Sequence, residues 1–307
     1  MIGRWLAGRR LGRRGWLLAQ AVLLSVLMAL PLVSEGGAVA RQSDQELVVL
    51  AYHEISEPSE AVNPELAVSP STFRRQLIWL IDHGYHPVSV DQILGANRGR
   101  APLPLHPLLL TFDDGYRSVF TDAFPLLQRY RLPAVVAVVG RWLEPSSGQV
   151  DFGDQHIDRN RLLSWTELRQ MESSGLVEIA NHSYDLHRGI PGNPQQNSMP
   201  AATTRRFDPS AGYEDQQAYR QRLRDDLQRN ADLLERELGR RPRVIVWPYG
   251  RYNSTGSAVA SELGMPVGLN LDDGANRLDV PLSRLRRVLM TAEMGATAGL
   301  EQELRAR

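Results

Sequence analysis

The amino-acid sequence predicts an α/β fold in which helices cover a parallel sheet, as in a (β/α) barrel. Short apolar segments alternate with longer segments of helical periodicity along most of the chain, and this alternation is typical of parallel sheets with helices outside. The polar residues that carry chemistry follow directly after apolar segments, as they do at the C-terminal mouth of a barrel. About 260 residues remain beyond the N-terminal segment, a length that fits one barrel-sized domain or two small ones.

Strands are predicted where short apolar runs lack helical spacing. Residues 134–139 are apolar almost throughout, which is typical of a parallel strand that is covered on both faces. The strands are expected at 47–52, 108–112, 134–139, 178–180, 244–247, 267–269 and 287–289.

Helices are predicted from apolar spacing and from capping residues. The segment Pro70–Thr72 is expected to cap a helix through His83, and Ser164 with Glu167 forms the pattern of a capping box. The helices are expected at 70–83, 91–94, 119–130, 165–173 and 216–238. Residues 189–215 are rich in Gly, Pro, Asn and Ser without apolar periodicity, so they predict a long loop that either covers substrate or is disordered.

The predicted strand 108–112 ends in two adjacent carboxylates and a glycine, Asp113, Asp114 and Gly115. A solvated turn is the commoner interpretation of such a triplet. Gly115 also provides a sharp exit from the strand, after which both carboxylates can face one cavity in different surroundings. Two carboxylates in different surroundings can divide the work, one binding a metal while the other transfers protons.

A second polar segment follows the apolar run 176–180 and contains two histidines, His182 and His187. Their spacing suits a loop rather than a helical metal site. A carboxylate with two imidazoles matches a catalytic metal site of three protein ligands, which leaves positions open for water and substrate. A single histidine would be read as a packed or surface residue, whereas two on one loop after a strand favour the ligand interpretation.

These two segments resemble the first two motifs of the NodB-like polysaccharide deacetylases, carbohydrate esterase family 4. The first is Thr111–Gly115 and the second is Asn181–His187. Three further segments resemble the branch of the family that removes N-acetyl groups from poly-β-1,6-N-acetyl-D-glucosamine: Ala51–Ile55, Asn193–Pro194 and Val246–Gly250. The resemblance covers roughly residues 46–290 and implies a distorted (β/α) barrel of the NodB/polysaccharide deacetylase type.

The resemblance also implies roles for individual residues. Asp114, His182 and His187 would hold a divalent metal ion, for which Zn, Co, Ni and Fe(II) all accept this ligand set. Asp113 takes the position of the general base. Most members carry the general acid as a late histidine, which the segment 284–290 lacks. In this branch the acid follows the first strand, where His53 matches it; the alternative for His53 is a structural contact.

The Trp-Pro-Tyr turn, Trp247, Pro248 and Tyr249, supplies the remaining implied contacts. The backbone N–H of Tyr249 matches the family's donor to the oxyanion. Trp247 offers either an apolar platform for a sugar ring or ordinary core packing, and the sequence does not separate the two. Either Arg286 or Arg287 would orient Asp113.

We expect from this resemblance a hydrolase that removes N-acetyl groups from exported poly-β-1,6-N-acetyl-D-glucosamine during maturation of a biofilm polysaccharide, with an outer-membrane export porin as a partner. Two alternatives remain open. One is a deacetylase of peptidoglycan or chitin-like oligosaccharides. The other is a non-catalytic polysaccharide-binding module, which would be expected if a metal ligand or the base were replaced. The sequence has no basic stripe with interleaved aromatic residues, so nucleic acid is not an expected partner.

The two ends of the chain carry separate expectations. Residues 1–40 predict a signal peptide with five early arginines, an apolar run at 16–33 and a small-x-small site at 38–40, and therefore export to the periplasm. An uncleaved inner-membrane anchor is the alternative. The chain has no cysteine, which excludes disulfides and a lipidated cysteine.

The deacetylase domain is expected at residues 41–290 and a C-terminal tail at 291–307. Members of the Gram-negative branch usually continue into a second, carbohydrate-binding domain. We therefore expect that domain to be either missing from this chain or encoded separately.

Overall fold

The structure is a computed structural model that describes residues 46–145, 147–152, 155–277, 281–295 and 297–305. The predicted signal peptide, residues 1–40, lies outside these ranges. Within them, no helix combines the length and the apolar character needed to cross a membrane.

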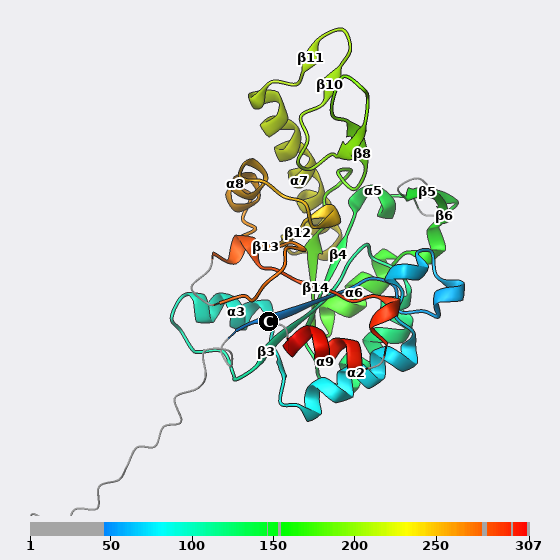
Figure 1. Ribbon diagram of the computed structural model, residues 1–307, viewed down its shortest axis with the longest axis vertical. Helices are drawn as coiled ribbons and strands as arrows, with labels where there is room; N and C mark the ends of the chain where they lie inside the picture. The colour runs from blue at the N-terminus through cyan, green and yellow to red at the C-terminus, as the bar shows by residue number, and fades with distance from the viewer. Residues whose placement is uncertain (1–45, 146, 153–154, 278–280, 296, 306–307) are drawn as a thin grey trace, which may run out of the picture. The chain divides into compact units, whose positions relative to one another are not determined.

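The fold is built on a parallel sheet, which Figure 1 shows at the centre with helices around it. Its strands run in the spatial order β13-β12-β7-β4-β3-β1-β14, and the short β2 pairs with the start of β3. Every pair of neighbouring strands in this sheet is parallel. The strands are β1 (Val48–Tyr52), β2 (His86–Pro87), β3 (Pro107–Phe112), β4 (Ala134–Val138), β7 (Val177–Asn181), β12 (Val244–Val246), β13 (Val267–Leu269) and β14 (Val288–Leu289).

The segment 285–289 connects the two edges of this sheet. Leu285 donates its N–H to the carbonyl of Gly268 at 2.8 Å and accepts the N–H of Asn270 at 2.9 Å, beside β13. Three residues later, Val288 pairs with Leu50 of β1. The sheet therefore closes into a distorted (β/α) barrel, as the sequence predicted.

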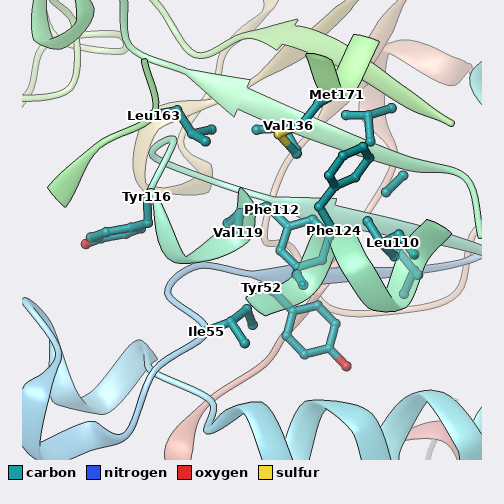
Figure 2. Close-up of a cluster of buried hydrophobic side chains, with 14 of the residues drawn as sticks. Tyr52, Ile55, Leu110, Phe112, Tyr116, Val119, Phe124, Val136, Leu163 and Met171 are labelled. Carbon is teal, nitrogen blue, oxygen red and sulfur yellow. The ribbon is translucent and has the colours of Figure 1, made fainter. Parts of the chain in front are cut away.

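Alternate strand residues fall into two separate cores, because successive side chains of a strand point to opposite sides. One set fills the barrel interior: Val49, Leu109, Val135, Ala137, Ala180, Val244, Val246, Val267, Leu269 and Leu285. The other set packs outward beneath the helices, and Figure 2 shows Leu110, Phe112 and Val136 of this cluster together with Phe124 and Met171. On β3, Thr111 and the following Asp113 share the register of Leu109 and so face the interior.

Five helices lie where the sequence predicted them, with differences at several ends, whereas α5 (Gly140–Leu143) and α8 (Ser254–Glu262) were not predicted. Ser69, rather than the following segment, caps the helix α2 by accepting the N–H of Thr72. The predicted helix at 119–130 begins as a π-helical segment, η4 (Val119–Ala123), before α4. The helices are α2 (Pro70–Asp82), α3 (Val90–Asn97), α4 (Phe124–Tyr130), α5 (Gly140–Leu143), α6 (Trp165–Ser173), α7 (Gln216–Leu238), α8 (Ser254–Glu262) and α9 (Ala298–Arg305).

Short 3-10 segments join these elements. They are η2 (Pro58–Glu60), η3 (Pro64–Leu66), η5 (Arg159–Arg161), η6 (Pro248–Gly250), η7 (Leu282–Arg284) and η8 (Ala292–Met294).

The predicted loop 189–215 contains β-hairpins, which the sequence did not indicate. The first pairs β8 (Gly189–Pro191) with β9 (Ser198–Pro200), and the second pairs β10 (Phe207–Asp208) with β11 (Gly212–Tyr213). Helix α7 holds this segment, because Tyr219 donates its hydroxyl to the carbonyl of Ala202 at 2.7 Å and Arg222 forms an ion pair with Glu214 at 2.8 Å. A third hairpin, β5 (Gln149–Phe152) with β6 (Gln155–Asp158), was not predicted either.

Candidate active site

Inward-facing polar side chains collect at one end of the barrel. Residues two positions apart on a strand share a face, so His53 continues the inward row of β1, Asp113 that of β3 and His182 that of β7. Arg287 follows the inward Leu285 in the same way. All four are at most 8% exposed. The predicted residues therefore converge where the parallel strands end, as the barrel geometry requires.

Asp114 leaves the sheet at the point where Asp113 still belongs to it. Asp113 donates its N–H to the carbonyl of Tyr52 at 2.9 Å and thereby extends the ladder. Asp114 and Gly115 then adopt φ angles of 69° and 70°. A side chain at Gly115 would in addition bring its Cβ within 3.0 Å of Val138. This left-handed pair turns the second carboxylate away from the first.

Asp114, His182 and His187 form a compact ligand set, the one such group among the described residues. The Oδ1 atom of Asp114 lies 3.3 Å from Nε2 of His182 and 3.3 Å from Nε2 of His187. Ligands about 2.0–2.2 Å from a tetrahedral ion lie about 3.3–3.6 Å apart, so the spacing fits a metal. Among the described residues, the buried Oδ1 of Asp114 has no hydrogen-bond partner, as expected of an atom reserved for a cation.

The orientation and charge of these side chains also fit a cation. His182 Nδ1 lies 2.7 Å from the carbonyl oxygen of Val246, a contact that leaves Nε2 for the metal. Burial alone would raise the pKa of Asp114, but His187 and His182 hold it well below its usual value. Burial lowers the pKa of His182, and the negative charge of the neighbouring Asp114 and Asp113 more than offsets this and raises it. A potential that attracts a proton in this way also attracts a metal ion.

Asp113 has a different set of partners. Arg287 donates from Nη1 to its Oδ1 at 2.7 Å and from Nη2 to its Oδ2 at 2.8 Å. The same guanidinium also donates to the hydroxyl of Thr111 at 3.1 Å and to the carbonyl of Asn270 at 3.1 Å. Burial raises the pKa of Asp113, yet Arg287 outweighs it and the net pKa is lowered. The carboxylate is therefore ionised and fixed in orientation.

Arg287, and not Arg286, is thus the arginine that orients Asp113. Arg286 instead contacts the carbonyl of Ala275. The sequence left the two open, although an alternation count from Leu285 would have selected Arg287.

His53 lies at the edge of the same network. Its Nε2 is 3.9 Å from Oδ2 of Asp113, and its buried Nδ1 has no partner in the described part of the chain. Burial lowers the pKa of His53, while Asp113 and Asp114 act in the opposite direction. A lowered pKa makes the protonated imidazole a stronger proton donor and at the same time favours the neutral form in the resting site.

The Trp-Pro-Tyr turn borders the site with a side chain that the sequence did not single out. Tyr249 is 44% exposed, and the centroid of its ring lies 4.4 Å from that of His187. Tyr249 has a φ of 56°. Trp247 is 1% exposed and packs with Val259 outside the barrel, so core packing describes it rather than a sugar platform. Pro248 is buried as well.

A cavity of about 480 Å³ opens beside His187. It is bounded by α5, the β5–β6 hairpin and the loop that carries His187. A larger cavity of about 700 Å³ lies at the start of α6 and includes none of the candidate site residues.

Comparison with known proteins gives a consistent result. Residues 101–268 match the polysaccharide deacetylase family. Over 237 residues the chain is 38% identical to the poly-β-1,6-N-acetyl-D-glucosamine N-deacetylase of Escherichia coli strain K12. The matched region covers 76% of this chain and 35% of that protein. The chain thus spans about a third of the length of this relative.

Two solved structures have a similar fold. A de-N-acetylase from Aggregatibacter actinomycetemcomitans superposes with a TM-score of 0.77 at 32% identity, over 83% of this chain and 99% of that one. The deacetylase domain of BpsB from Bordetella bronchiseptica superposes with a TM-score of 0.73 at 39% identity, over 80% of this chain and 96% of that one. By the extent of these matches and by its barrel, the chain belongs to the polysaccharide deacetylase family.

Proposed function

We propose that this protein is a metal-dependent hydrolase that removes N-acetyl groups from poly-β-1,6-N-acetyl-D-glucosamine. The observation that carries the proposal is the division between two adjacent carboxylates. Asp114 faces two imidazoles in a ligand set, while Asp113 is bound by Arg287 through both of its oxygen atoms. Amide hydrolysis uses both arrangements, because it needs a nucleophilic water and a base to receive its proton.

Asp114, His182 and His187 would hold the ion. A divalent ion at these ligands lowers the pKa of a water molecule and polarises the acetyl oxygen. Asp113, kept ionised by Arg287, accepts a proton from the attacking water. The backbone N–H of Tyr249 donates to the negative charge that develops on the acetyl oxygen when water attacks the acetyl carbon.

His53 completes the proton balance. Breaking the C–N bond leaves an amine that requires a proton. His53 follows β1, the strand between β3 and β14, and its Nε2 lies 3.9 Å from Oδ2 of Asp113. The protonated imidazole donates to the departing nitrogen. The products are acetate and a free amine on the sugar.

The relatives support the choice of substrate. The E. coli protein, with 38% identity, is named a poly-β-1,6-N-acetyl-D-glucosamine N-deacetylase, and the two structural neighbours are described as a de-N-acetylase and a deacetylase domain. As part of the same proposal, the predicted signal peptide at residues 1–40 directs the chain to the periplasm. There it would act in maturation of a biofilm polysaccharide and its handover to an export porin.

The test is acetate release by the metal-loaded full chain from β-1,6-linked N-acetylglucosamine oligomers and from β-1,4-linked oligomers of equal length. The proposal expects a higher kcat/KM on the β-1,6-linked series. An equal or higher value on the β-1,4-linked series would reassign the substrate to chitin-like or peptidoglycan chains. No acetate from either series would favour a binding module.

A further inference from the structure

The loop between the two candidate histidine ligands has an unusual backbone. Ser183 adopts a φ of 70° directly after His182. The next two N–H groups, those of Tyr184 and Asp185, both bond to a single carboxylate instead of to main-chain carbonyls. Successive N–H groups that point the same way form a concave site for an anion. The loop therefore depends on an anion supplied from elsewhere in the fold.

That anion is the side chain of Asp226, in the middle of α7. Its Oδ1 accepts the N–H of Tyr184 at 2.8 Å and its Oδ2 accepts the N–H of Asp185 at 2.8 Å. Both bonds are short, and the acceptor is a carboxylate, which makes them stronger than bonds between neutral groups. Asp226 touches neither histidine in these contacts; it fixes the backbone midway between them.

One helical turn further along α7, Asn230 holds the start of the same loop. Its Nδ2 donates to Oδ1 of Asn181 at 2.8 Å, and that oxygen also accepts the N–H of Ser183 at 2.8 Å. Residues four apart lie on the same face of a helix. Asp226 and Asn230, on one face of α7, thus bind the loop at its start, residue 181, and at its middle, residues 184 and 185.

The half-buried carboxylate of Asp226 is unfavourable to the stability of the fold when it is ionised. Burial raises the pKa of Asp226 to about 7, although the two backbone N–H groups act against this. An acid that is harder to ionise in the folded chain makes its ionised form a cost to folding.

We propose that Asp226 is a positioning residue for the metal site, one that holds His187 against Asp114 through the backbone of residues 184 and 185. The inference rests on the ligand set of the proposed function. Helix α7, which lies far from the ligands in sequence, would thereby determine the position of the ligand His187.

The test compares Asp226→Asn with Asp225→Asn in the full chain. The neighbouring Asp225 is exposed and contacts Gln221 on its own helix, so its replacement makes the same chemical change away from the loop. Two readouts are used: the Kd for Co²⁺ and the visible absorption spectrum of the Co²⁺-loaded protein, which reports the geometry of the ligands. Unfolding of the metal-free variants is measured in parallel.

We expect Asp226→Asn to weaken Co²⁺ binding about 10- to 100-fold, as loss of an outer partner of a metal ligand typically does, and to change the spectrum. Asp225→Asn should match the wild type in both. Asp226→Glu, which keeps two acceptor oxygens, should recover part of the affinity. Wild-type affinity and spectrum in Asp226→Asn would overturn the inference.

Failure of both Asp226 variants to unfold cooperatively would also overturn it, because the role would then lie in the fold itself. If the wild-type chain bound no Co²⁺, the proposed function would fail instead. The wild-type measurement therefore separates the two ideas.

Discussion

Asp113 and Asp114 show how far the surroundings, rather than the residue type, determine what a side chain can do. They are identical in chemistry and adjacent in sequence. Asp113 stays in register with β3 and bonds to Arg287. Asp114 adopts a φ of 69°, and its side chain faces the imidazoles of His182 and His187. Each carboxylate therefore has one role in the proposed reaction.

Asp113→Asn tests the first of these roles. The amide keeps the volume of the side chain and cannot accept the proton of a water molecule. We expect the variant to retain its metal and to lose activity about 100- to 10,000-fold, measured as metal content and acetate release on the same sample. Asp114→Asn is the matched control and should lose metal together with activity. Activity of Asp113→Asn within a few-fold of wild type would move the base to another residue.

His53 can be tested by the choice of leaving group. If His53 protonates the departing amine, His53→Ala should lower turnover of N-acetylglucosamine oligomers about 100-fold or more. An aryl acetate should be almost unaffected, because a phenolate leaves without a proton. Equal losses on both substrates would point instead to a structural contact, the alternative that the sequence left open.

At this scale the sequence predicted the members of the site and not all of their partners. The motif residues Asp113, Asp114, His182 and His187 follow strands and could be recognised locally. The carboxylate of Asp226 sits inside a charged helix of ordinary pattern, where nothing local marks it. Its role depends on which loop α7 packs against, and that is a property of the fold.

Among the elements, α6 shows how local sequence fixes a boundary. Ser164 accepts the N–H of Glu167 at 3.3 Å, and Glu167 accepts the N–H of Ser164 at 2.8 Å, so both partners of the predicted capping box are formed. Glu167 also pairs with Arg117 at 2.8 Å. By contrast, the hairpins in residues 189–215 have no apolar alternation in their sequence. They are stabilised by contacts with α7.

Glu167 gives a prediction with a defined pH dependence. Burial raises its pKa, but the hydrogen bonds with Ser164 and the ion pair with Arg117 lower it below the ordinary value of 4.5. A lowered pKa contributes stability above pH 4.5 that is lost as the pH falls through the folded-state pKa. We expect Glu167→Gln to reduce the free energy of unfolding by about 0.5–1.5 kcal/mol at pH 7, and the difference from wild type to shrink as the pH falls below 4.5.

The measurement is urea unfolding of the metal-free chain across this pH range. Glu172 on the same helix is the matched control, since burial raises its pKa. For Glu172→Gln the sign reverses: relative to wild type, this variant should gain stability as the pH rises. A difference for Glu167→Gln that is constant with pH would contradict the assignment.

For the whole molecule, the sequence predicted a barrel but neither the order of its strands nor the contacts that close it. Seven of the eight strands of the sheet were predicted within a few residues, because each is a short apolar run, whereas β2 was not predicted. Their order depends on long-range pairing, and closure depends on Leu285 and Val288 bonding to opposite edges of the sheet. Local periodicity carries no information about either.

The candidate metal ligands lie on loops that follow two different strands, β3 and β7, so a bound ion should stabilise the folded chain. A ligand that binds the folded state alone adds about 2.7 kcal/mol at a concentration of 100 times its Kd. We expect Tm to rise with Co²⁺ or Zn²⁺ concentration and to fall on chelation, as followed by thermal unfolding. His187→Ala, which removes one ligand, should show little of this rise. A wild-type Tm that is independent of metal would place the site elsewhere.

The most direct test of the account is a metal titration of the metal-free full chain, read out as acetate release from β-1,6-linked N-acetylglucosamine oligomers. The described residues contain a single group of three ligands. Activity should therefore be close to zero without metal, rise in proportion to the bound ion and level off at one ion per chain. Full activity in the metal-free protein, or no acetate at any metal loading, would contradict the assignment of a metal-dependent deacetylase.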